Sequence, residues 1–247
     1  MIAPLPLTGE RTVPGVPEEN YWFRRHEVAY EELLPLCRGA VVLEAGCGEG
    51  YGADLLAGVA DRVIGVDYDA ATVRHVRARY PRVDVLRGNL VGLPLAGGSV
   101  DVVVNLQVIE HLWDQAGFVR ECARVLRPGG LLAVTTPNRL TFSPGRHTPL
   151  NPFHTKEFDP RELRELVRGN GFRVVRAAGW HHGPRLRALD ARHGGSIIQA
   201  QVGVVLGATG WPAELLADVS GVTTADFVLR DDELDASLDL VLVAEKP

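Results

Sequence analysis

The first segment with residues suited to binding a ligand contains alternating glycines that follow Glu44 and precede Asp67. The stretch VLEAGCGEG, residues 42–50, places three glycines directly after a short apolar run. Glycine has no Cβ, so backbone N–H groups in such a turn can approach a ligand closely. Glu44 precedes the glycines, and Asp67 closes the next apolar run, where it can accept hydrogen bonds from both hydroxyls of a ribose. The spacing predicts a site for a nucleotide-like ligand.

The glycine spacing alone does not name that ligand. Gly48, Gly50 and Ala53 also match the G-x-G-x-x-A form of the dinucleotide fingerprint, with Asp67 at a fitting distance. Glu44 argues against a pyrophosphate, because a carboxylate at the strand end repels it but can hold a cationic amino acid group. No second βαβαβ half follows for a nicotinamide nucleotide, and the absence of G-x-x-x-x-G-K-[ST] excludes a P-loop.

Two histidines and a glutamate follow later apolar runs. Glu110 and His111 lie in LQVIEHLWD after residues 100–106, and His154 lies in the loop after residues 131–136. Both segments leave the same edge of the predicted sheet. We expect His111 to act as a general base, with Glu110 orienting it or contacting the acceptor, and His154 is the second candidate base. Alternatively, His111 caps or packs the following helix and His154 is structural or exposed.

Alternating strands and helices must position these residues. Strands are expected at residues 41–45, 62–67, 83–87, 100–106, 131–136, 172–179 and 238–245, and helices at residues 21–34, 54–60, 70–80, 114–126 and 161–169. This alternation implies parallel strands joined by right-handed crossovers. The run VDVVVNL predicts a strand buried on both faces. Pro35 is expected to end the first helix.

Two segments do not fit the alternation. Residues 138–159 are rich in Pro, Thr and His and have no period, so we expect a long loop. About sixty residues then separate the last two strands, and the final strand is expected to run antiparallel. We therefore predict one α/β domain over residues 1–247, divided into an N-terminal helical cap (1–38), a cofactor-binding core (39–180), a substrate-side insertion (181–237) and the last strand (238–247).

Composition limits the classes of function. The 247 residues are 46% apolar and 23% charged, which excludes a disordered or collagen-like chain. A net charge of −5 argues against nucleic acid or an anionic membrane as the main partner. Three cysteines without a CxxC pair favour reduced thiols. No stretch approaches the roughly 18 apolar residues of a membrane span, so we expect a soluble cytoplasmic protein.

Residues 40–180 resemble the class I S-adenosylmethionine-dependent methyltransferases. The resemblance rests on the E/D-x-G-x-G-x-G turn, the acidic end of the second strand, the pair Asn89 and Leu90, and the segment RVLRPGGLLAVTTPN. It implies a Rossmann-like fold with a seven-stranded, mostly parallel sheet and an antiparallel C-terminal strand. It also implies S-adenosylmethionine as cofactor and S-adenosylhomocysteine as product.

The resemblance also assigns contacts to the methionine and ribose parts of the cofactor. Glu44, Gly46 and Gly48 would hold the methionine part, and Asp67 would bind the ribose. Arg25 lies in the leading helix, which often folds over the cofactor in this family, and would pair with the methionine carboxylate.

Contacts to the adenine follow from the same resemblance. Tyr68 would lie beside the ring, and Asn89 would accept a hydrogen bond from its exocyclic amine through the amide oxygen. Leu90, the second residue of the pair, is also expected to bind the cofactor. Family members often have Asp at the position of Asn89. Asn105 and Gln107 would line the other side of the cofactor.

Further residues bear on a metal and on the acceptor. Some members of the family bind a divalent metal through a Glu-x-x-Glu-His cluster, but Gln107 stands at the first glutamate's place, so the sequence does not support a metal. The polar insertion begins with His181, His182 and Arg185, which suits a polyhydroxylated acceptor. Trp113 would stack on a sugar ring. The alternatives are solvated surface for the polar residues and a core position for the tryptophan.

Segments outside the cofactor motifs carry a closer resemblance. TGERTVP, ENYWFRRH, NPFHT and DARHGGSII resemble mycobacterial methyltransferases associated with polymethylated polysaccharides, notably 6-O-methylglucose lipopolysaccharide. This implies O-methylation of a sugar hydroxyl in an intracellular glucan or related oligosaccharide. The alternatives are a methyltransferase for a quinone, lipid or small natural product, a nicotinamide-dependent oxidoreductase, and a binding module without catalysis. The oligomeric state stays open.

Overall fold

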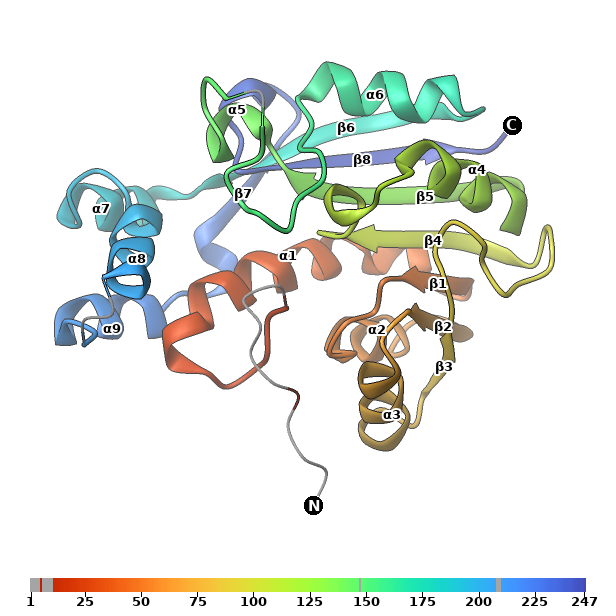
Figure 1. Cartoon of the computed structure of the whole chain (residues 1–247), viewed down its shortest axis with the longest axis horizontal. Helices are drawn as coiled ribbons and strands as arrows, with labels where there is room; N and C mark the ends of the chain where they lie inside the picture. The colour runs from red at the N-terminus through yellow and green to blue at the C-terminus, as the bar shows by residue number, and fades with distance from the viewer. Residues whose placement is uncertain (1–4, 6–10, 147, 208–209) are drawn as a thin grey trace.

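A mixed sheet runs through the centre of the molecule (Figure 1). The computed structural model describes residues 5, 11–146, 148–207 and 210–247. The strands of the described chain are β1 (Val41–Ala45), β2 (Arg62–Asp67), β3 (Val83–Arg87), β4 (Val100–Leu106), β5 (Leu126–Pro137), β6 (Arg173–His182), β7 (Phe227–Arg230) and β8 (Asp239–Glu245). Their order across the sheet is β3-β2-β1-β4-β5-β8-β6-β7.

Strand directions follow the sequence pattern for most of the sheet. Strands β1 to β5 pair in parallel. β8 lies between β5 and β6 and runs antiparallel to both, so the expected antiparallel C-terminal strand is confirmed. The expectation of seven strands is wrong, because β7 pairs with the end of β6 as an eighth strand. Its four residues are too few to show a period, and only the contact with β6 makes them a strand.

Helices cover both faces of the sheet (Figure 1). One face carries α4 (Gln115–Val125) and α6 (Pro160–Gly169), and the other carries α1 (Asn20–Cys37), α2 (Tyr51–Leu56) and α3 (Ala70–Arg79). Phe118 and Leu163 are buried in the first layer, and Leu33 and Val76 in the second. Strand β4 between the layers is buried along almost its whole length, as VDVVVNL predicts.

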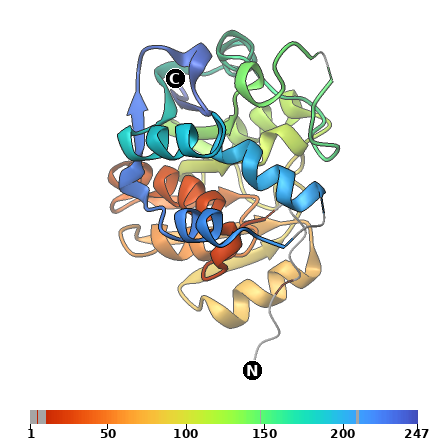
Figure 2. The ribbon, with the colours of Figure 1, turned by 90° about the vertical axis from the view of Figure 1, so that its left-hand side faces the viewer.

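Between β6 and β8 the chain forms a small helical layer beyond the carboxyl ends of the parallel strands (Figure 2). The short helix η4 (Leu234–Ala236) of this segment lies apart from the layer, beside β6. The layer itself contains α7 (Pro184–Arg192), α8 (Ile197–Leu206), α9 (Ala213–Ser220) and the short helix η3 (Thr224–Asp226). These helices pack against the start of α1 in an apolar cluster around Tyr21, Trp180 and Ile197. The division into cap, core, insertion and last strand stays a prediction. No helix among the described residues is long and apolar enough to cross a membrane.

Two helix boundaries differ from the expected ones. α1 continues past Pro35 to Cys37. A proline this close to the end removes only one helical hydrogen bond, and the buried side chains of Leu33 and Cys37 hold the last turn against the sheet. α2 begins at Tyr51, directly after the glycine turn, instead of at residue 54.

Differences of the same kind affect the second half of the chain. β5 begins at Leu126 instead of residue 131, because this segment pairs with the start of β4. Residues 138–159, expected as a loop, contain the short helix α5 (Arg139–Phe142). β6 continues to His182, so the two histidines at its end belong to the sheet and not to the insertion.

Candidate functional site

The turn after β1 has the backbone conformation that its glycines predict. Gly46 and Gly48 have φ angles of 89° and 51°, in the left-handed region. A Cβ on Gly46 would lie 2.7 Å from the side chain of Val108, so the turn has no room for one. A Cβ on Gly48 would meet no atom within 4 Å. The turn therefore leaves open space above Gly48, as a ligand would need.

Glu44 is buried beneath this turn, and in the described part of the chain only one of its two carboxylate oxygens has a hydrogen-bond partner. Its Oε1 accepts a hydrogen bond from the hydroxyl of Tyr30, whereas its Oε2 has no hydrogen-bond partner among the described residues. Burial, with a smaller contribution from the nearby Asp67, raises the pKa of Glu44 to about 8. An unpaired buried carboxylate oxygen is costly. The arrangement fits a cationic group, such as the ammonium of an amino acid, that would pair with it.

The raised pKa of Glu44 predicts that cofactor binding depends on pH. Below pH 8 the carboxyl group is mostly protonated, and a bound ammonium group would favour the ionised form. Binding should therefore release a proton, and the dissociation constant of S-adenosylhomocysteine should fall by up to about tenfold per unit as pH rises from 6 to 7. Calorimetry in buffers of different ionisation enthalpy would measure the proton. The same slope in Glu44→Gln would contradict this assignment.

Asp67 lies beside the glycine turn at the end of β2. Its Oδ2 accepts a hydrogen bond from the N–H of Gly48 at 3.1 Å, and its Oδ1 accepts one from the N–H of Asp69 at 2.9 Å. Burial raises the pKa of Asp67 above its usual value. Each carboxylate oxygen has more than one lone pair, so the group can still accept hydrogen bonds from a ligand.

The residues expected around the adenine lie nearby, and their roles stay predictions. The side chain of Tyr68 is 78% exposed, so it has no packing role in the described structure. Asn89 is exposed, and its Oδ1 accepts a hydrogen bond from the N–H of Val91. Leu90 is buried in the core.

Asn105 and Gln107 lie at the end of β4. Asn105 is buried and donates a hydrogen bond to the carbonyl of Ala45, while its Oδ1 has no partner among the described residues. Gln107 has a φ angle of 56°, which is unusual for a residue other than glycine. Such strained conformations cluster at functional sites. The side chain of Gln107 itself lines a cavity.

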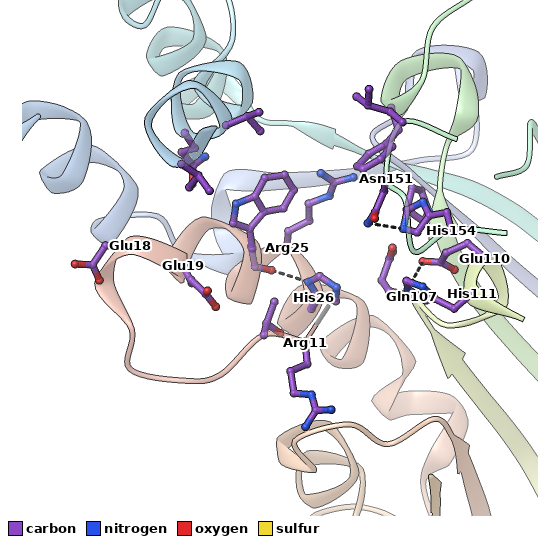
Figure 3. Close-up of a pocket in the computed structure, with 18 of the residues that line it drawn as sticks. Arg11, Glu18, Glu19, Arg25, His26, Gln107, Glu110, His111, Asn151 and His154 are labelled. Atoms are coloured by element: carbon purple, nitrogen blue, oxygen red, sulfur yellow. Dashed lines mark hydrogen bonds and ion pairs between the residues drawn. The ribbon is translucent and has the colours of Figure 1, made fainter. Parts of the chain in front are cut away.

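This cavity has a volume of about 700 Å³, within the usual range for small-molecule sites. Figure 3 shows Arg25 and His26 of α1 facing Glu110, His111 and His154 from the opposite wall. The cavity is also lined by Asn151 and Leu150 from the loop after α5, by Gln107 and Trp22, and by Gln201, Val202, Val205, Leu206 and Trp211 from the insertion. The sequence analysis singled out Gln107 among them but missed the rest.

His154 is held by a carboxylate that the sequence analysis missed. Its Nδ1 lies 2.8 Å from Oε1 of the buried Glu157, and its Nε2 lies 3.1 Å from the amide nitrogen of Asn151. With Nδ1–H donating to the carboxylate, Nε2 accepts a hydrogen bond from the side-chain amide of Asn151, and an acceptor or ion at Nε2 would have to displace that amide. The sequence signal that could have identified Glu157 as the partner of His154 is their spacing of three residues.

His111 and Glu110 lie against His154. The two histidine rings contact edge to face with centroids 4.9 Å apart, and Nδ1 of His111 lies 3.1 Å from the carbonyl oxygen of Phe153. Burial raises the pKa of Glu110 to about 7. The alternative that His111 caps the next helix is wrong, because Asp114 is the N-cap of α4.

The same three residues could hold a metal ion. One ligand atom from each of Glu110, His111 and His154 lies within 4.8 Å of the others. The other ring nitrogens contact Phe153 and Glu157, and such outer partners orient histidine ligands. Two imidazoles and one carboxylate suit a divalent transition metal. The sequence did not support a metal, because Gln107 stands at the first glutamate's place, and it named His154 only as a candidate base. His154 is 43 residues from His111 and joins Glu110 and His111 only in the folded chain.

Arg25 has a carboxylate partner within the protein. Its Nε and Nη2 donate to Asp239 at 2.6 and 2.7 Å, and Nη2 also donates to the carbonyl of Leu238. Both charged side chains are buried. The ion pair joins α1 to β8, so the structure gives Arg25 a structural role, and its expected contact with the methionine carboxylate stays a prediction.

None of the four residues expected to bind the acceptor lies on the wall of this cavity. The side chain of Trp113 is 91% exposed, which excludes a core position. His182 is hydrogen-bonded to Tyr21 and Asp190, and Arg185 pairs with Asp226. His181 lies on β6, paired with β7. The insertion instead contributes mostly apolar side chains of α8 to the cavity, which corrects the expectation of a polar lining.

Comparison with known proteins supports one family. Residues 43–134 match the model of a methyltransferase domain. A protein of Mycolicibacterium smegmatis described as a probable S-adenosylmethionine-dependent methyltransferase is 65% identical over 246 residues, covering 98% of this chain and 96% of that protein. A ubiquinone biosynthesis O-methyltransferase of Rhizobium johnstonii is 30% identical over 161 residues, covering 59% of this chain and 65% of that protein.

Solved structures agree on the fold. An S-adenosylmethionine-dependent methyltransferase from Thermotoga maritima superposes with a TM-score of 0.64 at 20% identity, covering 93% of this chain and 95% of the other. At this level of identity the likeness concerns the fold alone.

Proposed function

Because the chain belongs to the S-adenosylmethionine-dependent methyltransferases, we propose that it methylates a sugar hydroxyl of an intracellular glucan or related oligosaccharide. The observation that carries the proposal is the group formed by Glu110, His111 and His154 on the cavity wall. A hydroxyl acceptor must lose a proton during transfer, and neutral imidazoles at the wall can accept it. An acceptor without an acidic proton would need no such group.

In this proposal one group of residues binds the cofactor and a second group removes the proton of the acceptor hydroxyl. When bound, S-adenosylmethionine would supply an electrophilic methyl group: the acceptor oxygen would form the O–C bond as the S–C bond breaks, and S-adenosylhomocysteine would leave. Glu44 and the glycine turn hold the methionine part, and Asp67 holds the ribose. Nε2 of His111 takes the hydroxyl proton, and His154, oriented by Glu157, is the second base. A divalent ion held by Glu110, His111 and His154 would be an alternative to these bases: it would occupy the ring nitrogens and lower the pKa of the hydroxyl itself.

The cavity offers the groups that a sugar ring needs. Trp22 and Trp211 present flat aromatic surface, and the side-chain amides of Gln107, Asn151 and Gln201 can donate and accept hydrogen bonds. Few polar groups placed in a largely apolar pocket are the usual basis of orientation. The cavity wall therefore supports a polyhydroxylated acceptor, although the residues differ from those the sequence analysis named.

A methyltransferase for a quinone, lipid or small natural product is the second candidate. It is favoured by the apolar side chains of α8 on the cavity wall and by the relative described as a ubiquinone biosynthesis O-methyltransferase. The nicotinamide-dependent oxidoreductase is set aside, since the chain belongs to the methyltransferase family.

The first experiment should identify the acceptor. The protein would be incubated with methyl-labelled S-adenosylmethionine and gluco- and manno-oligosaccharides of several lengths, with and without a chelator. We expect label on one hydroxyl position, located by mass spectrometry, and loss of labelling with chelator if the cluster holds a metal. Cofactor binding without label on any saccharide would contradict the sugar acceptor and favour the second candidate or a binding module without catalysis.

A further inference from the structure

Helix α8 is apolar on two sides. On one side Ile197 and Val204 are buried in the cluster with α1 and α7. On the other side Val202, Val205 and Leu206 line the cavity. A helix that is apolar all round normally has both sides covered. Among the described residues, the second side of α8 is largely exposed and not covered by apolar side chains.

The uncovered side chains are large and well exposed. Val205 is 68% exposed and Leu206 is 81% exposed, and Leu150 across the cavity is 51% exposed. Contiguous exposed apolar side chains inside a cavity mark a binding surface for an apolar group. Charged side chains are not among those that α8 contributes to this wall.

The surface formed by Val202, Val205 and Leu206 lies where the acceptor would bind. It belongs to the same cavity as Glu110, His111 and His154, so a molecule whose hydroxyl reaches the histidines extends along the cavity toward α8. Of the residues expected to contact the cofactor, Arg25 and Gln107 line this cavity, whereas the glycine turn and Asp67 do not. The cavity therefore borders the cofactor side at Gln107 and extends from there to α8, which we assign to the acceptor.

We infer that the acceptor is amphipathic, with an alkyl or acyl group that packs on Val202, Val205 and Leu206 while its sugar hydroxyl meets the histidines. The inference rests on the proposed function. It adds that recognition of the acceptor depends on an apolar substituent, and that α8 is the element that selects it.

Alkyl glycosides provide a direct test. Binding of methyl, hexyl and octyl glucosides and mannosides, below micelle formation, would be measured by calorimetry on the protein saturated with S-adenosylhomocysteine. Each buried methylene is worth about fourfold in affinity. Since only part of the chain can be covered, we expect the octyl compounds to bind at least roughly tenfold more tightly than the methyl compounds. Equal affinities would overturn the inference.

Variants locate the effect on α8. In Val205→Ser/Leu206→Ser, the ratio of octyl to methyl affinity should fall below about threefold. Both side chains are exposed, so folding should be retained, and a melting curve would confirm it. The matched control is Val175→Ser on β6, which is also exposed but lies outside the cavity and should keep the wild-type ratio. An unchanged ratio in the double variant would overturn the inference.

Two further readouts separate this inference from the proposed function. Methyl transfer to the same glycosides reports the function: transfer to methyl and octyl glycosides at equal efficiency would support the sugar acceptor and overturn the apolar requirement. Preferential octyl binding without transfer to any glycoside would support the apolar surface and contradict the sugar acceptor. Light scattering on wild type and double variant would show a second copy covering α8, and a dimer lost in the variant with an unchanged octyl ratio would overturn the inference.

Discussion

His111→Ala is expected to lower kcat at least roughly 100-fold, with the dissociation constant of S-adenosylhomocysteine within about threefold of wild type. Loss of a general base typically costs 10²- to 10⁴-fold. The imidazole lies at the cavity wall and against His154. In the proposed function it faces the acceptor, so its removal should leave cofactor binding nearly intact. Steady-state kinetics with calorimetry would measure both quantities.

The control for this variant is another partly buried histidine. His193 pairs with Asp218 at 2.8 Å and lies outside the cavity, so His193→Ala should leave kcat near the wild-type value. Because His111 and His154 are in contact, His154→Ala and the double variant complete a cycle. Near-normal turnover of His111→Ala, with a large loss in His154→Ala, would assign the base to His154.

Asp67→Asn is expected to raise the dissociation constant of S-adenosylhomocysteine about 100-fold or more. Both oxygens of Asp67 accept backbone N–H groups, from Gly48 and Asp69. An asparagine must turn its NH₂ group toward one of these donors, which would disturb the turn as well as the proposed contacts with the ribose. A hydrogen bond to a charged group contributes about 1.5–3 kcal/mol, so loss of two ribose contacts accounts for this factor.

Asp84→Asn provides the matched control. Asp84 lies on β3, next to β2, and forms an exposed ion pair with Arg62. Exposed pairs contribute little, so cofactor affinity should stay within about twofold. Calorimetry on all three proteins would give the constants, and kcat at saturating cofactor should fall only severalfold in Asp67→Asn. An unchanged dissociation constant there would remove Asp67 from the ribose site.

The sequence by itself determined the strands that hold the cofactor side. The turn at Gly46 and Gly48 needs positive φ angles that glycine adopts without strain. Glu44 lies near the end of β1, two residues before Gly46, and Asp67 ends β2, which pairs with β1. All of this depends on contacts close in sequence or on the regular alternation of strands and helices. Periodicity and spacing report such contacts directly.

Only the tertiary structure decided the acceptor side. It brings His154 and Glu157 to His111 from 43 or more residues away, and it pairs Arg25 with Asp239 across 214 residues. It also turns the apolar side of α8, rather than the polar residues of the insertion, toward the cavity. No local pattern specifies these contacts, because each depends on how helices and loops distant in sequence pack at the end of the sheet.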